Sequence, residues 1–313
     1  MPGAARAGRG GGGVSRILAV GSVALDDVRT PFGRVKGALG GSASFFSASA
    51  RFFSAVSVIA VTGEDFSARH LSLLERLGVD TSGIERAKGR TFRWSGHYDY
   101  DLNSAKTLKT ELGVFRQFRP KLAAHHRRCR YVFLANIDPE IQFDVLRQAD
   151  RPLLTACDTM NFWIEHKKKA LVRLLGSVNI LLCNDAEARE LTGEHNLLKA
   201  AHWALSRGPK LFVVKKGEHG VVCFSKDFVF MAPAFLLEDV FDPTGAGDSF
   251  AGGFIGSLSR NGRLTQDAVR RAVIYGSVLA SYNVESFSLD RVARLTRPEI
   301  ERRYKAFKEL TRF

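Results

Sequence analysis

Short apolar runs alternate along this chain with segments whose apolar residues recur at helical spacing. The apolar runs end at Gly, Asn or Asp, which is typical of strands that enter turns. Strand-like runs occupy residues 17–20, 56–61, 131–135, 153–157, 180–183 and 211–215, and a hairpin-like pair covers 221–231. Helix-like segments occupy residues 42–53, 66–77, 141–148, 166–175, 185–191, 197–206, 248–259 and 265–282. This alternation predicts an α/β fold with a mainly parallel sheet and right-handed crossovers.

Two stretches depart from the alternation. Residues 91–114 carry Phe92, Trp94 and Tyr98 among polar residues, with period-two alternation at first. This pattern is typical of exposed antiparallel strands. Residues 24–36 are polar and are interrupted by Pro31 and Gly33.

The composition is that of an ordinary globular protein: 313 residues, 45% apolar and 25% charged. No apolar run approaches the roughly 18–20 residues that a bilayer span requires, so we expect no membrane segment.

Residues 1–13 are rich in Gly, Ala and Arg and lack an apolar core, so we interpret residues 1–15 as a disordered tail rather than a signal peptide. The four scattered cysteines fit buried, reduced thiols, and we expect a cytoplasmic protein.

The formal net charge is +14, and the basic residues are spread along the chain. The sequence shows no zinc-finger spacing, no recognition-helix pattern and no aromatic-glycine RNA signature. We therefore expect a solvated basic surface that also attracts an anionic small molecule, and no nucleic-acid partner.

The run from Asp242 to Asp248, Asp-Pro-Thr-Gly-Ala-Gly-Asp, precedes an apolar helix pattern. Glycines at a helix start let backbone N–H groups approach an anion, and the helix dipole adds positive potential there. A carboxylate in this place is suited to take a proton from a hydroxyl beside a phosphate. Asp and Gly are also common helix caps, which is the simpler interpretation of the same residues.

The complete run resembles the C-terminal signature of the PfkB/ribokinase family of carbohydrate kinases, and the resemblance extends from about Ile17 to Leu289. It implies a ribokinase-like three-layer α/β sandwich over residues 16–313, with a small β lid built from residues 26–37 and 90–115. It also implies that Asp248 is the catalytic base and that the amides of Gly245, Ala246 and Gly247 form an anion hole.

The same resemblance assigns a substrate site. Asp26, after Gly21-Ser22, would accept hydrogen bonds from two sugar hydroxyls, and Gly40 and Gly41 would let the backbone approach the substrate. The family usually has Asn four residues after the second glycine, whereas this chain has Phe45, which can stack on a ring or simply pack. Asn136 lies in another loop at a strand end and is a further candidate for substrate binding.

The remaining motifs concern ATP and metal ions. The resemblance implies that Asn184 and Glu187 position Mg²⁺ and phosphates, with Glu187 acting through water, although an acidic first helical turn has the same sequence. Nucleotide-binding candidates are Lys215, Gly217, Gly220, Thr244 and Asn283, and Lys215 with Lys216 also fits a surface pair. Asp242, Thr244 and Ser288 are candidates for a K⁺ site of the kind that relatives use.

The resemblance therefore predicts a phosphotransferase with an alcohol acceptor. Our first expectation is an ATP-dependent sugar kinase. A nucleoside kinase of the same fold and an inactive ligand-binding protein are the alternatives. A homodimer formed through the lid would be consistent with the family. No P-loop motif and no protein-kinase catalytic loop occur in the sequence.

Overall fold

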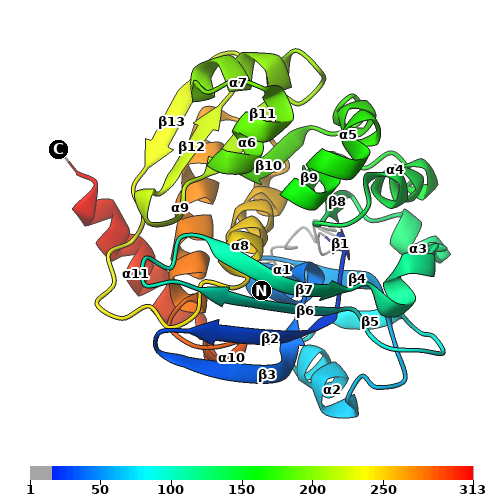
Figure 1. Cartoon of the computed structure of the whole chain (residues 1–313). Coiled ribbons are helices and arrows are strands. Elements are labelled where there is room, and N and C mark those ends of the chain that lie inside the picture. Colours follow the sequence, from blue (N-terminus) through cyan, green and yellow to red (C-terminus); the bar gives the residue numbers. More distant parts are fainter. Residues whose placement is uncertain (1–15, 313) are drawn as a thin grey trace, which may run out of the picture.

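One nine-stranded sheet forms the centre of the computed structural model, which describes residues 16–312 (Figure 1). The predicted tail at residues 1–15 lies outside the described residues. The strand order is β13-β12-β11-β10-β9-β8-β1-β4-β5; the strands from β11 to β5 are parallel, and β12 and β13 are antiparallel additions at one edge. The bounds are β1 (Arg16–Val20), β4 (Ala55–Thr62), β5 (Asp80–Arg86), β8 (Tyr131–Leu134), β9 (Leu154–Asp158), β10 (Ile180–Asn184), β11 (Leu211–Lys215), β12 (Val221–Phe224) and β13 (Val229–Ala232).

A separate four-stranded sheet, which we call the lid sheet, has the order β3-β2-β6-β7 (Figure 1). Its strands are β2 (Ala24–Thr30), β3 (Gly33–Gly40), β6 (Arg93–Tyr98) and β7 (Ala105–Glu111). The structure thus places strands in both stretches that depart from the regular alternation. That the lid sheet closes over a ligand stays a prediction.

Helices cover both faces of the central sheet. Strand side chains alternate between the faces, and β1 shows this: Ile17 and Ala19 belong to one core cluster, whereas Leu18 and Val20 belong to the other. The first cluster includes residues of α1 (Ser42–Ala50), α2 (Ala68–Arg76), α8 (Ala246–Asn261), α9 (Gln266–Asn283), α10 (Asp290–Arg294) and α11 (Arg297–Leu310). The second includes residues of α4 (Pro139–Gln148), α5 (Asn161–Leu175), α6 (Asp185–Thr192) and α7 (Leu197–Leu205), and the short α3 (Ala124–Arg127) lies at its edge. The predicted three-layer α/β sandwich is confirmed.

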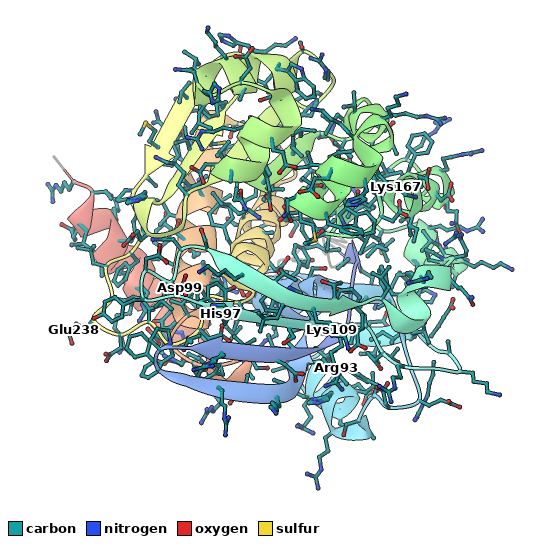
Figure 2. The ribbon with its side chains drawn as sticks, viewed as in Figure 1. Arg93, His97, Asp99, Lys109, Lys167 and Glu238 are labelled. Atoms are coloured by element: carbon teal, nitrogen blue, oxygen red, sulfur yellow. The ribbon has the colours of Figure 1, made fainter. Side chains whose placement is uncertain are left out.

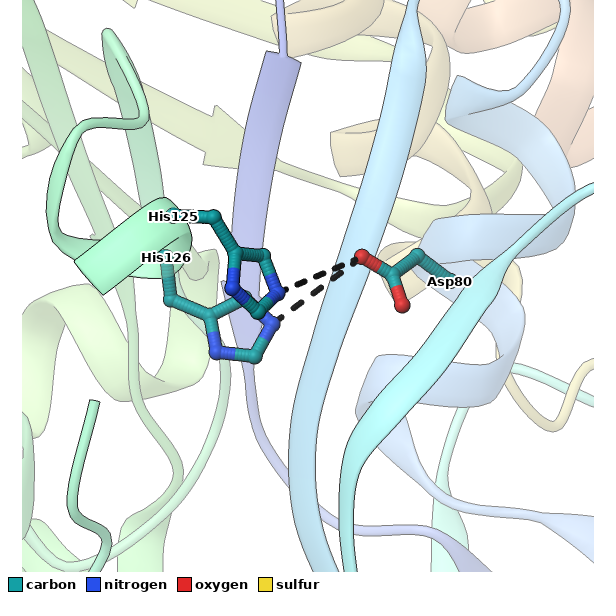
Figure 3. A group of neighbouring side chains, drawn as sticks. All are labelled: Asp80, His125 and His126. Atoms are coloured by element: carbon teal, nitrogen blue, oxygen red, sulfur yellow. Dashed lines mark ion pairs between the residues drawn. The ribbon is translucent and has the colours of Figure 1, made fainter. Parts of the chain in front are cut away.

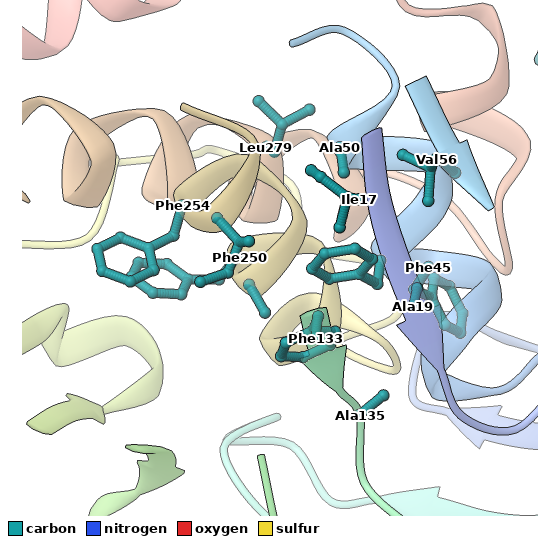
Figure 4. Packing of buried hydrophobic residues seen from close by; sticks show 14 of the residues in the cluster. Ile17, Ala19, Phe45, Ala50, Val56, Phe133, Ala135, Phe250, Phe254 and Leu279 are labelled. Atoms are coloured by element: carbon teal, nitrogen blue, oxygen red, sulfur yellow. The ribbon is translucent and has the colours of Figure 1, made fainter. Parts of the chain in front are cut away.

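Aromatic rings fill the core beneath α1 and α8 (Figure 4). The rings of Phe46 and Phe133 stack with centroids 4.1 Å apart. A Cβ at Gly252 would come within 2.4 Å of the Phe46 carbonyl oxygen, so a glycine there lets α8 pack closely on α1. This packing fixes the N-terminal end of α8 relative to the sheet.

The predicted helix at residues 166–175 is too short. Helix α5 begins at Asn161 and contains a kink at Lys167, whose φ of −135° and ψ of 30° are not helical. The apolar spacing changes phase at this kink, so the pattern revealed only the part of the helix after it.

All four cysteines are buried and free, as predicted. Among residues 16–312, no helix combines the length and the apolar character needed to cross a membrane.

Candidate active site

The N-terminus of α8 forms the centre of the candidate site. Gly245 caps this helix with a φ of 76°, a conformation that L side chains rarely adopt. The Ala246 N–H donates to the Pro243 carbonyl oxygen (3.1 Å) and is thereby engaged in the turn. The predicted role of Ala246 in the anion hole is therefore not favoured by its geometry, and the roles of the Gly245 and Gly247 amides stay predictions.

A buried ion pair lies directly beside this helix end. The Lys215 Nζ donates to the Asp158 Oδ2 at 2.6 Å, and both side chains are largely buried. A Cβ at Gly247 would lie 3.1 Å from the Lys215 Nζ, which places the ammonium against the first turn of α8. Burial alone would lower the pKa of Lys215, but the carboxylates of Asp158 and Glu187 outweigh it and raise the pKa above its usual value. Lys215 is therefore a fixed cation in the site, and the interpretation of it as a surface lysine is wrong.

Asp248, in the first turn of α8, has a pKa raised to about 7. Burial is the main cause, the negative charge of Asp158 adds to it, and the Lys215 ammonium opposes both. A carboxyl group with a pKa near 7 can both accept and release a proton at neutral pH, which suits a general base.

Asn184 and Glu187 form a capping box at the start of α6. The Asn184 Oδ1 accepts from the Glu187 N–H, and the Glu187 Oε2 accepts from the Asn184 N–H, both at 2.7 Å. Burial raises the pKa of Glu187 to about 7; Lys215 lowers it and Asp158 raises it. The motif thus serves as a helix cap. The other carboxyl oxygen of Glu187, Oε1, takes no part in the capping box.

Asp26 lies on β2 of the lid sheet. Its side chain is 6% exposed, and its pKa is raised to about 8 by burial and by the nearby carboxylates of Asp242 and Asp248. The Gly41 N–H partly offsets this rise. A Cβ at Gly40 would lie 1.8 Å from the Asp26 Oδ2, so only glycine leaves room for the carboxyl group. The structure therefore brings Asp26, Gly40 and Gly41 together, near Asp248.

The lid sheet contacts the body on both sides of the site. The Thr244 Oγ1 donates to the Tyr98 Oη (3.3 Å), and burial raises the pKa of Tyr98, with added effect from the nearby acids. Beyond β6, the Asn103 Nδ2 donates to the Glu218 Oε1 at 2.6 Å. Glu218 lies in η2 (Gly217–His219), the turn between the predicted nucleotide-binding glycines. Sequence reasoning missed both lid contacts, since nothing local marks them.

The predicted glycine loop is tight. Gly217 and Gly220 have φ values of 55° and 83°, and the Lys216 N–H donates to the Gly220 carbonyl oxygen at 2.8 Å. The loop follows β11 directly, so Lys215 and Gly217 lie at the same strand end. That this loop binds a nucleotide stays a prediction.

Phe45 requires a correction. Its side chain is only 2% exposed, and a Cβ at Gly245 would lie 2.4 Å from its ring. The ring therefore packs against Gly245, in the loop that precedes α8, and presents no stacking face to a substrate. Of the two predicted roles of Phe45, stacking on a ligand ring and packing in the core, the structure supports packing.

Asn283 requires a second correction. It is fully buried; its amide nitrogen donates to the Thr244 carbonyl oxygen (2.8 Å), and its Oδ1 accepts from the Ser249 hydroxyl (3.0 Å). Both ends of the amide hold the loop that precedes α8. Asn283 is thus a structural residue rather than a lining of a nucleotide pocket.

The remaining candidates keep unused acceptor atoms. The Asp242 Oδ1 accepts from the Thr244 N–H (2.9 Å), whereas the buried Oδ2 of Asp242 has no hydrogen-bond partner among the described residues. Ser288 has a φ of 57° and donates its hydroxyl to the Leu39 carbonyl oxygen. The Oδ1 of Asn136, after β8, is also buried without a partner in the described part of the chain. Such atoms are costly unless something binds them, so they mark Asp242 and Asn136 as candidates for ligand contacts.

A cavity of about 570 Å³ lies on the opposite face of the lid sheet from Asp26. Its lining carries both acidic and basic side chains and consists of Asp27, Asp65, Arg90, Arg93, Ser95, Lys109 and Glu111. Figure 2 shows Arg93, His97 and Lys109 on the strands of this sheet. Because Asp27 and Asp26 point to opposite faces, this cavity is separate from the acids at the strand ends.

Known proteins resemble this chain over most of its length. The profile of the pfkB family of carbohydrate kinases matches residues 143–291. A cytidine kinase of Thermococcus kodakarensis is 29% identical over 259 residues, which are 81% of this chain and 92% of that protein.

Two solved structures share the fold. A nucleoside kinase of Burkholderia thailandensis, in complex with inosine, matches with a TM-score of 0.77 and 19% identity, over 93% of this chain and 97% of that one. An E. coli protein provisionally named ribokinase II, with ATP and Mg²⁺, matches with a TM-score of 0.74 and 17% identity, over 94% of this chain and 100% of that one. The family resemblance predicted from the motifs is confirmed.

Proposed function

We propose that this chain, which belongs to the pfkB family of carbohydrate kinases, transfers the γ-phosphoryl group of ATP to a hydroxyl of a nucleoside. Family membership makes it a phosphotransferase with an alcohol group as acceptor. This disfavours the inactive ligand-binding alternative. The nucleoside acceptor, the roles of single residues and the lid closure are our inferences.

The observation that carries the proposal is the position of Asp248. Its carboxyl group, with a pKa raised to about 7, lies in the first turn of α8, beside the buried Lys215 and within electrostatic reach of Asp26. A base, a cation and helix-end amides thus meet at one point. This is the set of groups that transfer of a phosphoryl group to a hydroxyl requires.

In the proposed reaction, Asp26 accepts hydrogen bonds from two adjacent hydroxyls of the acceptor and orients it. Asp248 takes the proton of the attacking hydroxyl while the oxygen of that hydroxyl bonds to the γ-phosphorus. The bond from that phosphorus to the bridging oxygen of ADP breaks, and ADP leaves. Lys215 and the amides of Gly245 and Gly247 stabilise the negative charge on the phosphates.

Magnesium fits the residues present. Asp158, Glu187 and Asp248 place three carboxyl groups around a single ammonium, so the cluster carries excess negative charge. Mg²⁺ prefers oxygen ligands and usually keeps several waters. The leftover oxygen of Glu187, acting through water, is our candidate for holding Mg²⁺, which would neutralise phosphate charge when bound. The K⁺ site at Asp242, Thr244 and Ser288 stays a prediction that the comparisons do not support.

Two observations support a nucleoside as the acceptor. The cytidine kinase match spans nearly all of that relative, and a fold neighbour binds inosine. In this chain, Trp94 is the register partner of Asp26 across β2 and β6, so both residues lie on the same face of the lid sheet, where the Trp94 ring covers Gly96 and donates its Nε1–H to the Thr107 hydroxyl. A base attached to a ribose held by Asp26 would have an aromatic surface within reach.

The sugar acceptor expected first from the sequence is the second candidate, because the family is described by carbohydrate kinases and Asp26 would hold either kind of diol. A screen of ADP release separates the two. The purified chain, ATP and Mg²⁺ are combined with cytidine, uridine, inosine, adenosine, ribose, fructose or inositol.

We expect at least one nucleoside to be used with a kcat/KM at least tenfold above that of free ribose. Addition of 2′-deoxycytidine tests the diol contact, since loss of one hydroxyl bonded to Asp26 should raise KM. Activity confined to sugars would refute the nucleoside proposal and leave the family assignment intact.

A further inference from the structure

Asp80, His125 and His126 meet where strand β5 of the central sheet begins (Figure 3). Asp80 is the first residue of β5, and the two histidines lie on α3, which precedes β8. The parallel strands β4, β5 and β8 all begin on this side of the sheet, whereas Asp158 and Lys215 lie at the opposite side, at the carboxyl ends of β9 and β11. The Nε2 atoms of both histidines are 3.9 Å from the Asp80 Oδ2, and the potential ligand atoms all lie within 4.8 Å of one another.

His126 is the unusual member of this cluster. Its side chain is almost fully buried, and neither ring nitrogen has a hydrogen-bond partner among the described residues. Burial is the main cause that lowers the pKa of this ring. A buried imidazole without partners loses the hydrogen bonds that it makes in water, so this ring is best explained by a ligand.

Asp80 is held in a fixed position by hydrogen bonds to two serines. Its Oδ1 accepts from the N–H and the hydroxyl of Ser82 (3.1 and 2.7 Å), and its Oδ2 accepts from the Ser57 hydroxyl (2.8 Å). Although burial opposes them, these bonds and Arg16 lower the pKa of Asp80 to about 2. The Arg16 guanidinium lies 3.5 Å from the carboxylate and would repel a cation. The Arg16 side chain is 41% exposed, so it can turn toward solvent when a cation binds.

We propose that Asp80, His125 and His126 bind a divalent transition-metal ion, with Zn²⁺ as the ion that best fits two imidazoles and one carboxylate. Ligand atoms in a tetrahedral zinc site lie about 3.3 Å apart, given bonds of about 2.0–2.1 Å. The observed 3.9 Å separations therefore need a contraction of about half an ångström. His125 is 45% exposed and can make this movement, and its exposure leaves a fourth position for water.

The ion would have a structural role. Helix α3 has four residues and no side-chain cap at its N-terminus. A metal ion would join it to β5, the outermost strand of the central sheet. Because the cluster lies where the strands begin and not at their carboxyl ends, we expect the ion to affect stability rather than catalysis.

Titration of Zn²⁺ into the tag-free, chelator-treated chain by calorimetry tests this proposal, with Co²⁺ and its visible absorption as a second probe. We expect one equivalent to bind and the unfolding temperature to rise. His125→Ala and Asp80→Asn should weaken binding at least tenfold. The exposed His202→Ala is the matched control and should bind as wild type does.

Two checks keep the result interpretable. His125 is exposed, so His125→Ala should fold and keep ADP release with Mg²⁺ unchanged, which excludes misfolding as the cause of lost binding. Asp248→Asn tests whether the ion binds at the active site instead. The proposal is overturned if wild type binds no stoichiometric Zn²⁺, if His125→Ala binds as tightly as wild type, or if only Asp248→Asn loses binding.

Discussion

Replacing Asp248 with Asn tests the site through two independent quantities, turnover and stability. The substitution keeps the shape of the side chain and removes its ability to accept a proton. Loss of a general base typically costs about 10²–10⁴-fold in rate. We therefore expect ADP release with the preferred acceptor to fall by that factor.

The stability effect follows from the raised pKa. The carboxyl group has a pKa of about 7 in the folded chain, against its ordinary 3.8, so the folded state holds a proton that the unfolded state releases between these values. Stability therefore falls as pH rises from about 4 to 7 and stays low above 7. A rise of about 3 pKa units corresponds to a ceiling of about 4 kcal/mol. Relaxation and water penetration reduce this, and we expect Asp248→Asn to stabilise the fold by about 1–3 kcal/mol at pH 8.

The assay compares wild type and Asp248→Asn by urea unfolding at pH 5 and pH 8, with ADP release measured in parallel at pH 8. The stability gain at pH 8 should exceed the gain at pH 5, because wild type carries a smaller charging penalty at the lower pH. Asp144→Asn, on the far helix α4, is a control that should change neither quantity. Turnover within tenfold of wild type, or an equal stability difference at both pH values, would refute the reasoning.

Three further outcomes are expected. Lys215→Met should destabilise the fold by about 3–5 kcal/mol in urea unfolding, because it leaves Asp158 buried without its cation, and adding Asp158→Asn should restore part of the loss. Gly245→Ala should lower the unfolding temperature and reduce turnover, since its φ of 76° and the adjacent Phe45 ring leave no room for a methyl group; an unchanged melting curve would contradict the packing described. In wild type, kcat/KM measured from pH 5 to 9 should rise with pH through about 7 as Asp248 loses its proton and rise further through about 8 as Asp26 does; a profile without a rise near 7 would contradict the role of Asp248 as a base.

Much of the site could be predicted because its residues lie in local motifs. The run from Asp242 to Asp248 carries its own helix start, and Gly40 and Gly41 lie beside a strand end. In a parallel sheet the carboxyl ends of the strands lie on one side, so Asn184 and Lys215, which end β10 and β11, could be expected to lie close together.

The buried contacts could not be predicted in the same way. Lys215 and Lys216 look alike in the sequence, and only the packing of β11 decides that Lys215 turns inward to Asp158. Phe45 and Asn283 lie at positions that suggest ligand contacts, yet one supports Gly245 and the other holds Thr244 from within the core. These roles depend on tertiary neighbours that no local pattern encodes.

The Asp80 cluster was missed for a related reason. Asp80 and the two histidines come from separate elements, and their spacing matches no common metal-binding motif. Only the buried ring of His126, which has no hydrogen-bond partner among residues 16–312, marks the cluster, and that feature requires the folded chain. A sequence search for neighbouring histidines would have found His125 and His126 without their acidic partner.

The central claim is that a nucleoside hydroxyl receives the phosphoryl group of ATP, and the fate of a labelled γ-phosphate tests it most directly. The chain is incubated with γ-labelled ATP, Mg²⁺ and equal amounts of cytidine and ribose, and the products are separated and identified by mass spectrometry. The account predicts label in a nucleoside monophosphate, and none there with Asp248→Asn. Label found only in ribose phosphate or in inorganic phosphate would contradict it.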